Sequence, residues 1–339
     1  MKNLPLVSVI MPIYNGEVFM EESIRSVLSQ SYKNIELLIC NDASTDATAK
    51  IIEKLMQEDS RIKVINNAVN SGIAISRNNL LDMVKGKYFI TQDCDDNMLP
   101  GKIAKQVAYM EKHPECGLCG TWAYKVDVQT RPFGKIMHPI NDEDIRVNLL
   151  FQNSMVQPSV MVRSLFIDRY RYDSNFLVCE DYDYWERLAA ISKLHNIPEF
   201  LVQYRIHNTN ISKSKEQLLL DKTKEIKLRQ LVRLNLSAAE YIEIHDAIGA
   251  LRYPEENWKV WRSQGIDWLK KLIDYNQEKK IYPENVFKAF VWYRWIRYCV
   301  KKRDFLCAIF PKFFTLNPIV ISRVLSLLFM LIKSSKIRG

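Results

Sequence analysis

The first 126 residues alternate short apolar runs with amphipathic segments, and this alternation limits the fold more than any other feature. The apolar runs predict strands at residues 6–11, 35–40, 62–65, 88–90 and 118–126. Apolar positions recur at helical spacing between them, which predicts helices at residues 19–28, 51–55, 73–84 and 101–112. Strands that are apolar almost throughout are typical of a parallel sheet covered on both faces. We therefore expect an α/β fold with a Rossmann-like, mostly parallel sheet and right-handed crossovers.

Polar residues follow three of the predicted strands. They occupy residues 12–15 after the first strand, 41–46 after the second and 93–96 after the fourth. In open α/β sheets, ligands bind outside the carboxyl ends of the strands. The coincidence predicts a ligand site at this edge of the sheet.

Three carboxylates close the apolar run that begins at Tyr88. Asp93 and Asp95 are two residues apart, so extended backbone points both to the same side, and Asp96 follows at the turn. Carboxylates this close repel one another unless a cation lies among them. Mg²⁺ or Mn²⁺, which prefer oxygen ligands, would neutralise them. The alternative is a solvated acidic turn that caps the helix after Pro100.

Beyond residue 127 the pattern loosens. Residues 130–144 are polar and contain prolines, which predicts a mobile connector, and further strands are expected at 159–162 and 200–204. Glu180, Asp181 and Asp183 begin a predicted helix, whose dipole favours their ionised forms. From residue 216 the chain is helical without a glycine-rich linker. We expect a catalytic domain over residues 1–215 and a helical region over 216–339.

The net charge of +9 belongs to the end of the chain. Residues 286–339 hold eleven Lys or Arg against one acid, Asp304, so the remainder sums to about −1. This distribution speaks against a nucleic-acid groove across the fold, and no nucleic-acid partner is expected. Seven irregularly spaced cysteines and no signal peptide before Leu6 favour a reducing cytosol. We interpret Cys116 and Cys119 as buried strand residues rather than as a zinc or redox pair.

The last 90 residues combine aromatic and basic side chains with an apolar run. That run, residues 318–332, contains Arg323 and has too few residues to span a bilayer. An apolar helix beside aromatic and basic residues suits a membrane interface with anionic lipid. The alternative is a small helical appendage whose tryptophans form its core and whose Lys and Arg face water.

Six motifs occur in an order that resembles the family 2 glycosyltransferases, which have the GT-A fold. They are Pro12-x-Tyr14-Asn15, Asn41-Asp42 through Asp46, Asn70-Ser-Gly72 with Ala74 and Arg77-Asn78, Asp93-Cys94-Asp95-Asp96 with Pro100, Glu180-Asp181, and Tyr204-Arg-x-His207 with Ser212. The resemblance covers about residues 5 to 215. Within the family, the chain is similar to bacterial members that extend lipooligosaccharide or capsule. Asn41 and Cys94 depart from commoner residues without removing a functional group.

The resemblance implies a UDP-sugar site at the strand ends. Tyr14 would stack on the uracil and Asp42 would accept its N3–H, while Asp93 and Asp95 would hold the ribose and a divalent ion. Asp96 would be a ligand or support one, and His207 would complete the metal site. The remaining donor contacts would come from Pro12, Asn15, Asn70, Arg77 and Cys94. Alternatively, Arg77 is an ion-pair partner and His207 a hydrogen-bonded loop residue.

The implied reaction is metal-dependent and inverting. Asp181 would take the proton of an acceptor hydroxyl, with Glu180 beside it, while Mn²⁺ or Mg²⁺ stabilises the departing diphosphate. The donor would be UDP-GlcNAc or another UDP-hexose or hexosamine, and the acceptor a cell-surface glycan or a lipid-linked glycan at the cytoplasmic face of the membrane. The alternative role for Asp181 is a helix N-cap. Alternative functions are a nucleotidyltransferase or a catalytically silent sugar-nucleotide-binding module.

Overall fold

The computed structural model describes residues 4–208, 210, 215–236, 238–252, 257–309, 311 and 317–335. These residues form two compact units. The sheet unit comprises the described residues of 4–140 and 155–219, and the helical unit those of 141–154 and 220–335. Residues 141–154, which the sequence analysis assigned to the catalytic domain, therefore fold with the C-terminal helices.

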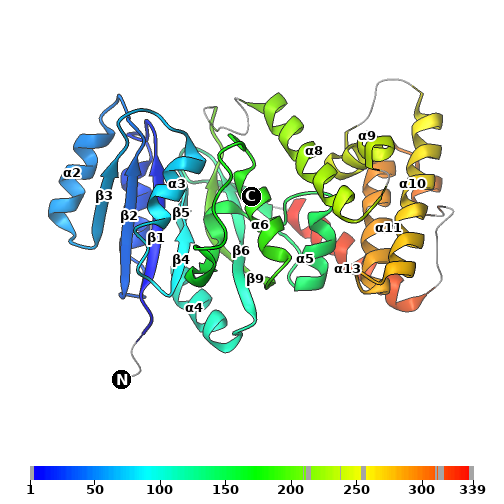
Figure 1. The fold of residues 1–339 in the computed structure, drawn as a ribbon, viewed down its shortest axis with the longest axis horizontal. Coiled ribbons are helices and arrows are strands. Elements are labelled where there is room, and N and C mark those ends of the chain that lie inside the picture. The colour runs from blue at the N-terminus through cyan, green and yellow to red at the C-terminus, as the bar shows by residue number, and fades with distance from the viewer. Residues whose placement is uncertain are drawn as a thin grey trace. The chain divides into compact units, whose positions relative to one another are not determined.

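Four parallel strands form the first half of the sheet, in the order β3-β2-β1-β4 (Figure 1). They are β1 (Val7–Ile13), β2 (Ile35–Asn41), β3 (Ile62–Asn66) and β4 (Tyr88–Thr91). Every residue of β1 and β2 is buried, because helices cover both faces of these strands. The predicted parallel arrangement is confirmed for this half.

The second half of the sheet is mixed, which corrects the expectation of a mostly parallel sheet. Antiparallel pairs join β8 (Met161–Arg163) to β4 and β6 (Cys116–Val126), and β5 (Asn97–Met98) to β9 (Lys193–Arg205). β9 runs parallel to β6. The connector predicted at 130–144 is instead β7 (Pro132–Ile136), paired antiparallel with β6, followed by the start of α5 (Asp142–Leu149).

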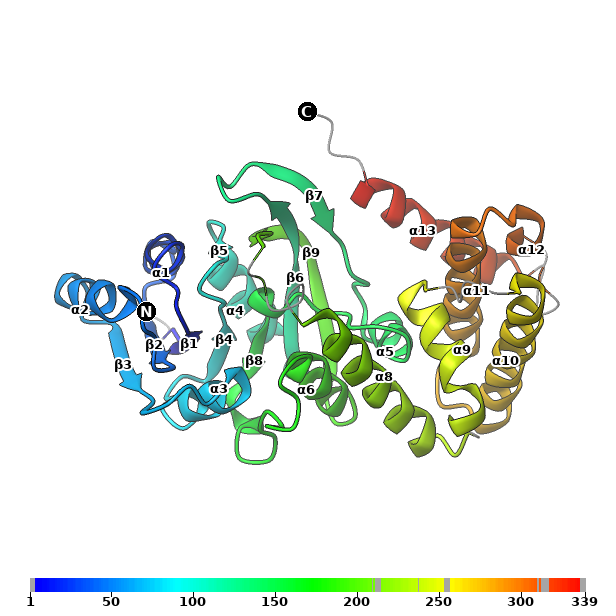
Figure 2. The same cartoon turned by 90° about the horizontal axis from the view of Figure 1, so that it is seen from above.

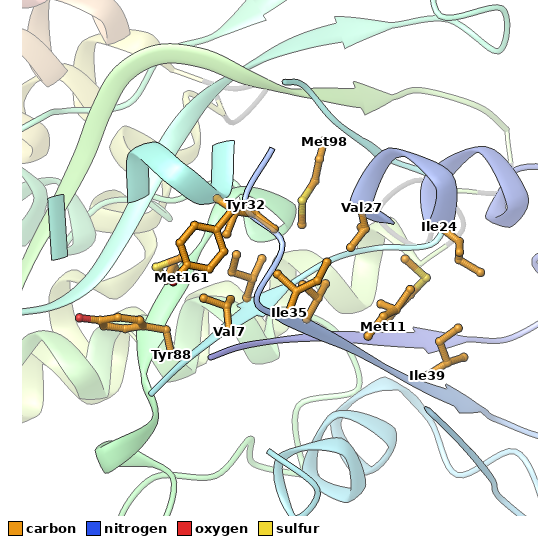
Figure 3. Packing of buried hydrophobic residues seen from close by; sticks show 14 of the residues in the cluster. Val7, Met11, Ile24, Val27, Tyr32, Ile35, Ile39, Tyr88, Met98 and Met161 are labelled. Atoms are coloured by element: carbon orange, nitrogen blue, oxygen red, sulfur yellow. The ribbon is translucent and has the colours of Figure 1, made fainter. Parts of the chain in front are cut away.

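Helices α1 (Met20–Leu28), α2 (Thr48–Glu58) and α4 (Lys102–Lys112) bury their apolar sides in one core against the sheet. Figure 3 shows part of this core, with Met11 of β1, Ile24 and Val27 of α1, and Ile39 of β2. Helix α3 (Ile73–Leu81) packs on the other face of β1 and β2 (Figure 2). The loops between these elements therefore emerge at the carboxyl ends of β1, β2 and β4.

The helical unit contains α5 and most of the chain after residue 219. Its further helices are α8 (Glu216–Arg233), α9 (Ala238–Ala250), α10 (Trp258–Lys279), α11 (Glu284–Lys301), α12 (Phe305–Ile309) and α13 (Pro318–Ser335). Trp268, Trp292 and Trp295 are buried in its core, so these tryptophans are structural, as the alternative interpretation held. Among the helices that the structure describes, none has the length and hydropathy needed to cross a membrane.

Candidate active site

The loop after β1 is fastened to the loop after β2. The backbone N–H of Asn15 donates to Ser44 Oγ at 3.0 Å, and Asn15 Oδ1 accepts from the Thr45 N–H at 2.8 Å. Asn15 has a φ of 50°, a left-handed conformation that asparagine tolerates better than most residues. Pro12 is buried in β1, whereas Tyr14 is 49% exposed. The tyrosine ring is thus presented to solvent by a fixed loop.

Asp42 organises the segment that leads into α3. Its Oδ1 accepts from the Ser71 N–H at 2.9 Å and from Asn67 Nδ2 at 2.7 Å, while Oδ2 accepts from the Gly72 N–H at 2.9 Å. Gly72 has a φ of 87°, which suits glycine. Asn70, in the same loop, is exposed. Asp42 therefore has a structural task in addition to the base contact that the family resemblance implies.

Arg77 lies at the centre of a buried ionic cluster. Its side chain is 2% exposed and pairs with Asp93 Oδ1 at 2.9 Å and with Glu180 Oε1. The Tyr172 ring centroid lies 5.4 Å from its Cζ, and the Gln157 amide accepts from the guanidinium at 2.9 Å when its oxygen is assigned to the position facing Arg77. The sequence alternative of an ion-pair role for Arg77 is confirmed, although the residue is buried. Its contact with donor phosphates stays a prediction.

This cluster brings the carboxylates after β4 together with those of α6 (Glu180–Ala189). Burial lowers the pKa of Arg77, but Glu180 and Asp93 outweigh burial and raise it, so the guanidinium remains charged. Burial raises the pKa of Asp93 to about 6 against the opposing effect of Arg77. Burial and the neighbouring Glu180 raise the pKa of Asp181 to about 7.

Asp181 is in the first turn of α6, which begins after Cys179 in a left-handed conformation with a φ of 61°. Cys179 holds the N-cap position, so Asp181 is the second residue of the helix rather than its N-cap. Asp181 is partly exposed, and its Oδ1 accepts from the Tyr182 N–H at 2.7 Å. The helix dipole favours its anion, whereas burial disfavours it, and this combination is typical of a tuned base.

Asp96 is buried and stabilises the turn that follows β4. It is 1% exposed; Oδ1 accepts from the Arg205 N–H at 2.7 Å, and Oδ2 is buried without a hydrogen-bond partner among the described residues. Burial raises its pKa well above the ordinary range, and Asp95 adds to this effect. Arg205 also donates from Nε to the Asp95 carbonyl at 2.8 Å and from a terminal nitrogen to Glu22 at 2.7 Å.

Asp95 meets His207 at this edge. His207 Nε2 lies 2.9 Å from Asp95 Oδ2, and Asn210 Nδ2 lies 3.3 Å from the same oxygen. A carboxylate and an imidazole suit Mn²⁺, and a divalent ion commonly takes its remaining ligands from water and substrate phosphates. Within the described ranges, no three His, Cys, Asp or Glu side chains form a ligand cluster, and Asp93 pairs with Arg77 instead. Asp95 and His207 thus fit a metal that the substrate helps to hold.

Four residues of this site have no individual role in the sequence analysis: Gln157, Tyr172, Arg205 and Asn210. Arg205 lies within the motif Tyr204-Arg-x-His207, and His207 was the residue that indicated this segment. Gln157, in the short 3-10 turn η1 (Gln157–Ser159), and Tyr172 follow no recognisable spacing. Cys94 packs against the sheet core and has no polar task in the cluster. Ser212, the end of the last motif, lies outside the described residues.

Comparison with known proteins places the chain among enzymes. The family model described as glycosyl transferase family 2 matches residues 8–193. An uncharacterised glycosyltransferase of Haemophilus influenzae is 34% identical over 229 residues, which are 62% of this chain and 69% of that protein. The Escherichia coli enzyme WfgD, a UDP-Glc:α-D-GlcNAc-diphosphoundecaprenol β-1,3-glucosyltransferase, is 32% identical over 217 residues, covering 62% of this chain and 81% of WfgD.

Two solved structures share the fold. Staphylococcus aureus TarS 1–349 in complex with UDP has a TM-score of 0.56 at 17% identity, covering 88% of each chain. The mannosyltransferase PcManGT of Pyrobaculum calidifontis, in complex with GDP-Man and Mn²⁺, has a TM-score of 0.56 at 12% identity, covering 96% of this chain and 88% of that one. Since the family model covers more than half of the chain and the carboxylate motifs meet at one sheet edge, this protein belongs to glycosyltransferase family 2 and is a glycosyltransferase with the GT-A fold.

Proposed function

We propose that the enzyme transfers a sugar, with inversion, from a UDP-sugar to a hydroxyl of a growing cell-surface glycan. One observation carries this proposal: Arg77 bridges Asp93, at the end of β4, to Glu180, and Asp181 is the next residue. The donor carboxylates and the candidate base are therefore parts of one ionic cluster. WfgD, which uses UDP-Glc and a diphosphoundecaprenol-linked acceptor, supports the choice of a UDP donor and a lipid-linked glycan.

The donor would bind across the loops after β1 and β2. The exposed ring of Tyr14 is available to stack face to face on a pyrimidine ring. Asp42 would accept the uracil N3–H while it keeps its bonds to residues 71 and 72. Pro12, Asn15 and Asn70 would shape this pocket, and Asp93 would accept a ribose hydroxyl. These contacts would select a UDP-sugar over a donor without a pyrimidine.

Asp95 and His207 would hold Mn²⁺ or Mg²⁺. When bound, the ion supplies positive charge for the diphosphate oxygens of the departing UDP. The chain's own contribution is to hold Asp95 in place: Asn210 donates to its carboxylate, and the Arg205 side chain donates to its backbone carbonyl. Asp96, buried behind it, supports the turn that presents Asp95.

In the chemical step, Asp181 accepts the proton of the acceptor hydroxyl. The hydroxyl oxygen attacks the anomeric carbon from the side opposite the UDP, so the carbon–oxygen bond to UDP breaks as the new bond forms. An α-linked donor then gives a β-glycoside, and UDP departs with its negative charge. Arg77, paired with Glu180 next to the base, limits the repulsion between neighbouring carboxylates. The reaction would take place at the cytoplasmic face of the membrane.

The test is UDP release from a panel of UDP-sugars with Mn²⁺ and a diphosphoundecaprenol-linked saccharide acceptor. We expect release with one or a few donors and none with Asp181→Asn. A catalytically silent binding module would release no UDP from the wild-type enzyme. A nucleotidyltransferase would instead release pyrophosphate from a nucleoside triphosphate and a sugar phosphate. Either result would contradict the proposal.

A further inference from the structure

Helix α13 (Pro318–Ser335) is apolar on two opposite sides. One side, with Val320, Val324 and Leu327 buried, packs in the core of the helical unit, where Ala289 and Trp292 of α11 lie against it. The other side exposes three large apolar side chains: Leu325 (61%), Phe329 (57%) and Ile332 (52%). A surface helix normally has a polar outer side, so this outer apolar face (residues 325, 329 and 332) is a candidate docking surface.

The charges of α13 match an anionic surface. The helix has two cations, Arg323 and Lys333, and no acid. Arg323 is ion-paired with Asp144 of α5 at 2.9 Å, within the same unit. Lys333 lies over the Phe329 ring, with Nζ 4.5 Å from the centroid, at the border of the outer apolar face. In the sequence, Lys336 and Arg338 follow directly.

A second exposed apolar site in the helical unit has the same character. Phe305 and Leu306 of α12 are 58% and 80% exposed and come after the basic run at residues 301–303. Long basic side chains next to apolar ones suit a membrane interface, because their stems remain among lipid tails while their charges reach the phosphates.

We infer that the outer apolar face of α13 docks on an anionic phospholipid bilayer. The helix lies in the plane of the interface, with Leu325, Phe329 and Ile332 below the headgroups and Lys333 at the lipid phosphates. A second copy of the chain is a poorer occupant, because α13 offers no acid to receive the cations of its counterpart. The inference rests on the proposed function, since an enzyme that extends a lipid-linked glycan must reach its acceptor at a membrane surface.

The test is co-sedimentation of the full chain with vesicles of phosphatidylcholine and phosphatidylglycerol (7:3), compared with vesicles of phosphatidylcholine alone. We expect binding to the anionic vesicles that weakens as salt increases, because the attraction to the headgroups is screened. The variant Leu325→Ser/Phe329→Ser should bind anionic vesicles at least ~10-fold more weakly, since it removes two large apolar side chains from the contact.

The matched control is Leu165→Ser/Val232→Ser, which removes two apolar side chains that are 69% and 57% exposed outside α13. This control should bind vesicles as the wild-type chain does, and both variants should keep the wild-type melting temperature. UDP release with a water-soluble acceptor should be unchanged in both, which separates a failure of docking from a failure of the proposed chemistry. Equal vesicle binding by the α13 variant, no binding by the wild-type chain, or a dimer that the α13 variant abolishes would each overturn the inference.

Discussion

Buried cations have different surroundings in the two units. In the helical unit, Lys227 donates to Asp246 at 2.8 Å, Asp246 also pairs with Arg252, and Arg294 meets neutral oxygens of Asn148 and Gln152. In the sheet unit, a single guanidinium, Arg77, pairs with two carboxylates of a larger acidic group, Asp93, Asp95, Asp96, Glu180 and Asp181. In the helical unit three cations surround one carboxylate, whereas negative charge is in excess in the sheet unit, where the proposed chemistry occurs.

The excess is visible in the acidities of the sheet unit. Burial raises the pKa of Asp93, Asp96 and Asp181, and neighbouring carboxylates add to the effect at each. Burying several neighbouring carboxylates lowers the stability of the fold unless a bound cation or substrate compensates for their charge. The comparison teaches that the two buried clusters should respond differently to substitution: one in catalysis, the other in stability alone.

The largest effect is expected from Asp181→Asn, which keeps the shape of the side chain and removes the base. We expect kcat to fall about 10²–10⁴-fold, with little change in KM for the donor. The matched control is Asp183→Asn in the same helix turn, whose carboxylate pairs with Arg187 at 2.6 Å. Asp183→Asn should lower the melting temperature, because this ion pair is lost, and should change kcat much less than Asp181→Asn does. Near-normal turnover by Asp181→Asn would remove the base from the proposed mechanism.

The comparison itself is tested by Arg77→Met and Lys227→Met. Both remove a cation whose side chain is at most 3% exposed. Arg77→Met takes away the cation that Asp93 and Glu180 share, whereas Lys227→Met leaves Asp246 paired with Arg252. Arg77→Met should cost about 3–5 kcal/mol in urea unfolding, and Lys227→Met should cost less because Asp246 keeps Arg252. Below the melting temperature, only Arg77→Met should also lower kcat/KM, because only Arg77 touches the proposed site. Equal losses of kcat/KM in both variants would show that the two clusters do not differ in function.

A smaller effect is expected from pH. The pKa of Asp181 is raised to about 7, and a general base works only when ionised. At a fixed, saturating Mn²⁺ concentration, kcat should therefore rise with pH through neutrality and level off above it. Below that point it should fall about tenfold per pH unit. A kcat that stays flat from pH 5 to 8 would conflict with this assignment.

The smallest effect concerns two asparagines in left-handed conformations, Asn15 in the sheet unit and Asn235 in the helical unit, with φ of 50° and 52°. Glycine keeps each conformation and removes the amide. Asn15→Gly loses the side-chain bond from the Thr45 N–H and should cost about 1 kcal/mol and raise the donor KM. Asn235→Gly should leave the donor KM unchanged. A raised KM in both variants would point to a general loss of rigidity.

Local patterns were sufficient for the parallel half of the sheet. The apolar runs of β1, β2 and β4 and the polar residues after them predicted both the strands and the edge at which Asp42 and Asp95 are found. The direction of β8 was not predicted, because a strand of three residues, Met161–Arg163, gives the same pattern in parallel and antiparallel pairing. The hairpin of β6 with β7 was also missed, since its exposed residues follow no clear alternation.

Contacts between residues far apart in sequence were out of reach. Residues 141–154 join the helical unit partly because Arg294 bonds to Asn148, 146 positions away. Arg77 is buried because Glu180, 103 positions away, and Tyr172 close over it. The periodicity of apolar residues along α3 does not predict which distant residues contact Arg77. The motif order therefore predicted the candidate residues, while the structure supplied the ion pairs that connect Arg77 to Asp93 and Glu180.

The most direct test of the account is calorimetric titration of UDP into the enzyme with Mn²⁺ and again with EDTA. The shared site of Asp95, His207 and the donor diphosphate predicts that Mn²⁺ tightens UDP binding at least ~10-fold, about 1.4 kcal/mol. Asp95→Asn, with an unchanged melting temperature, should bind UDP equally weakly under both conditions. An identical UDP affinity of the wild-type enzyme with Mn²⁺ and with EDTA would contradict the central claim.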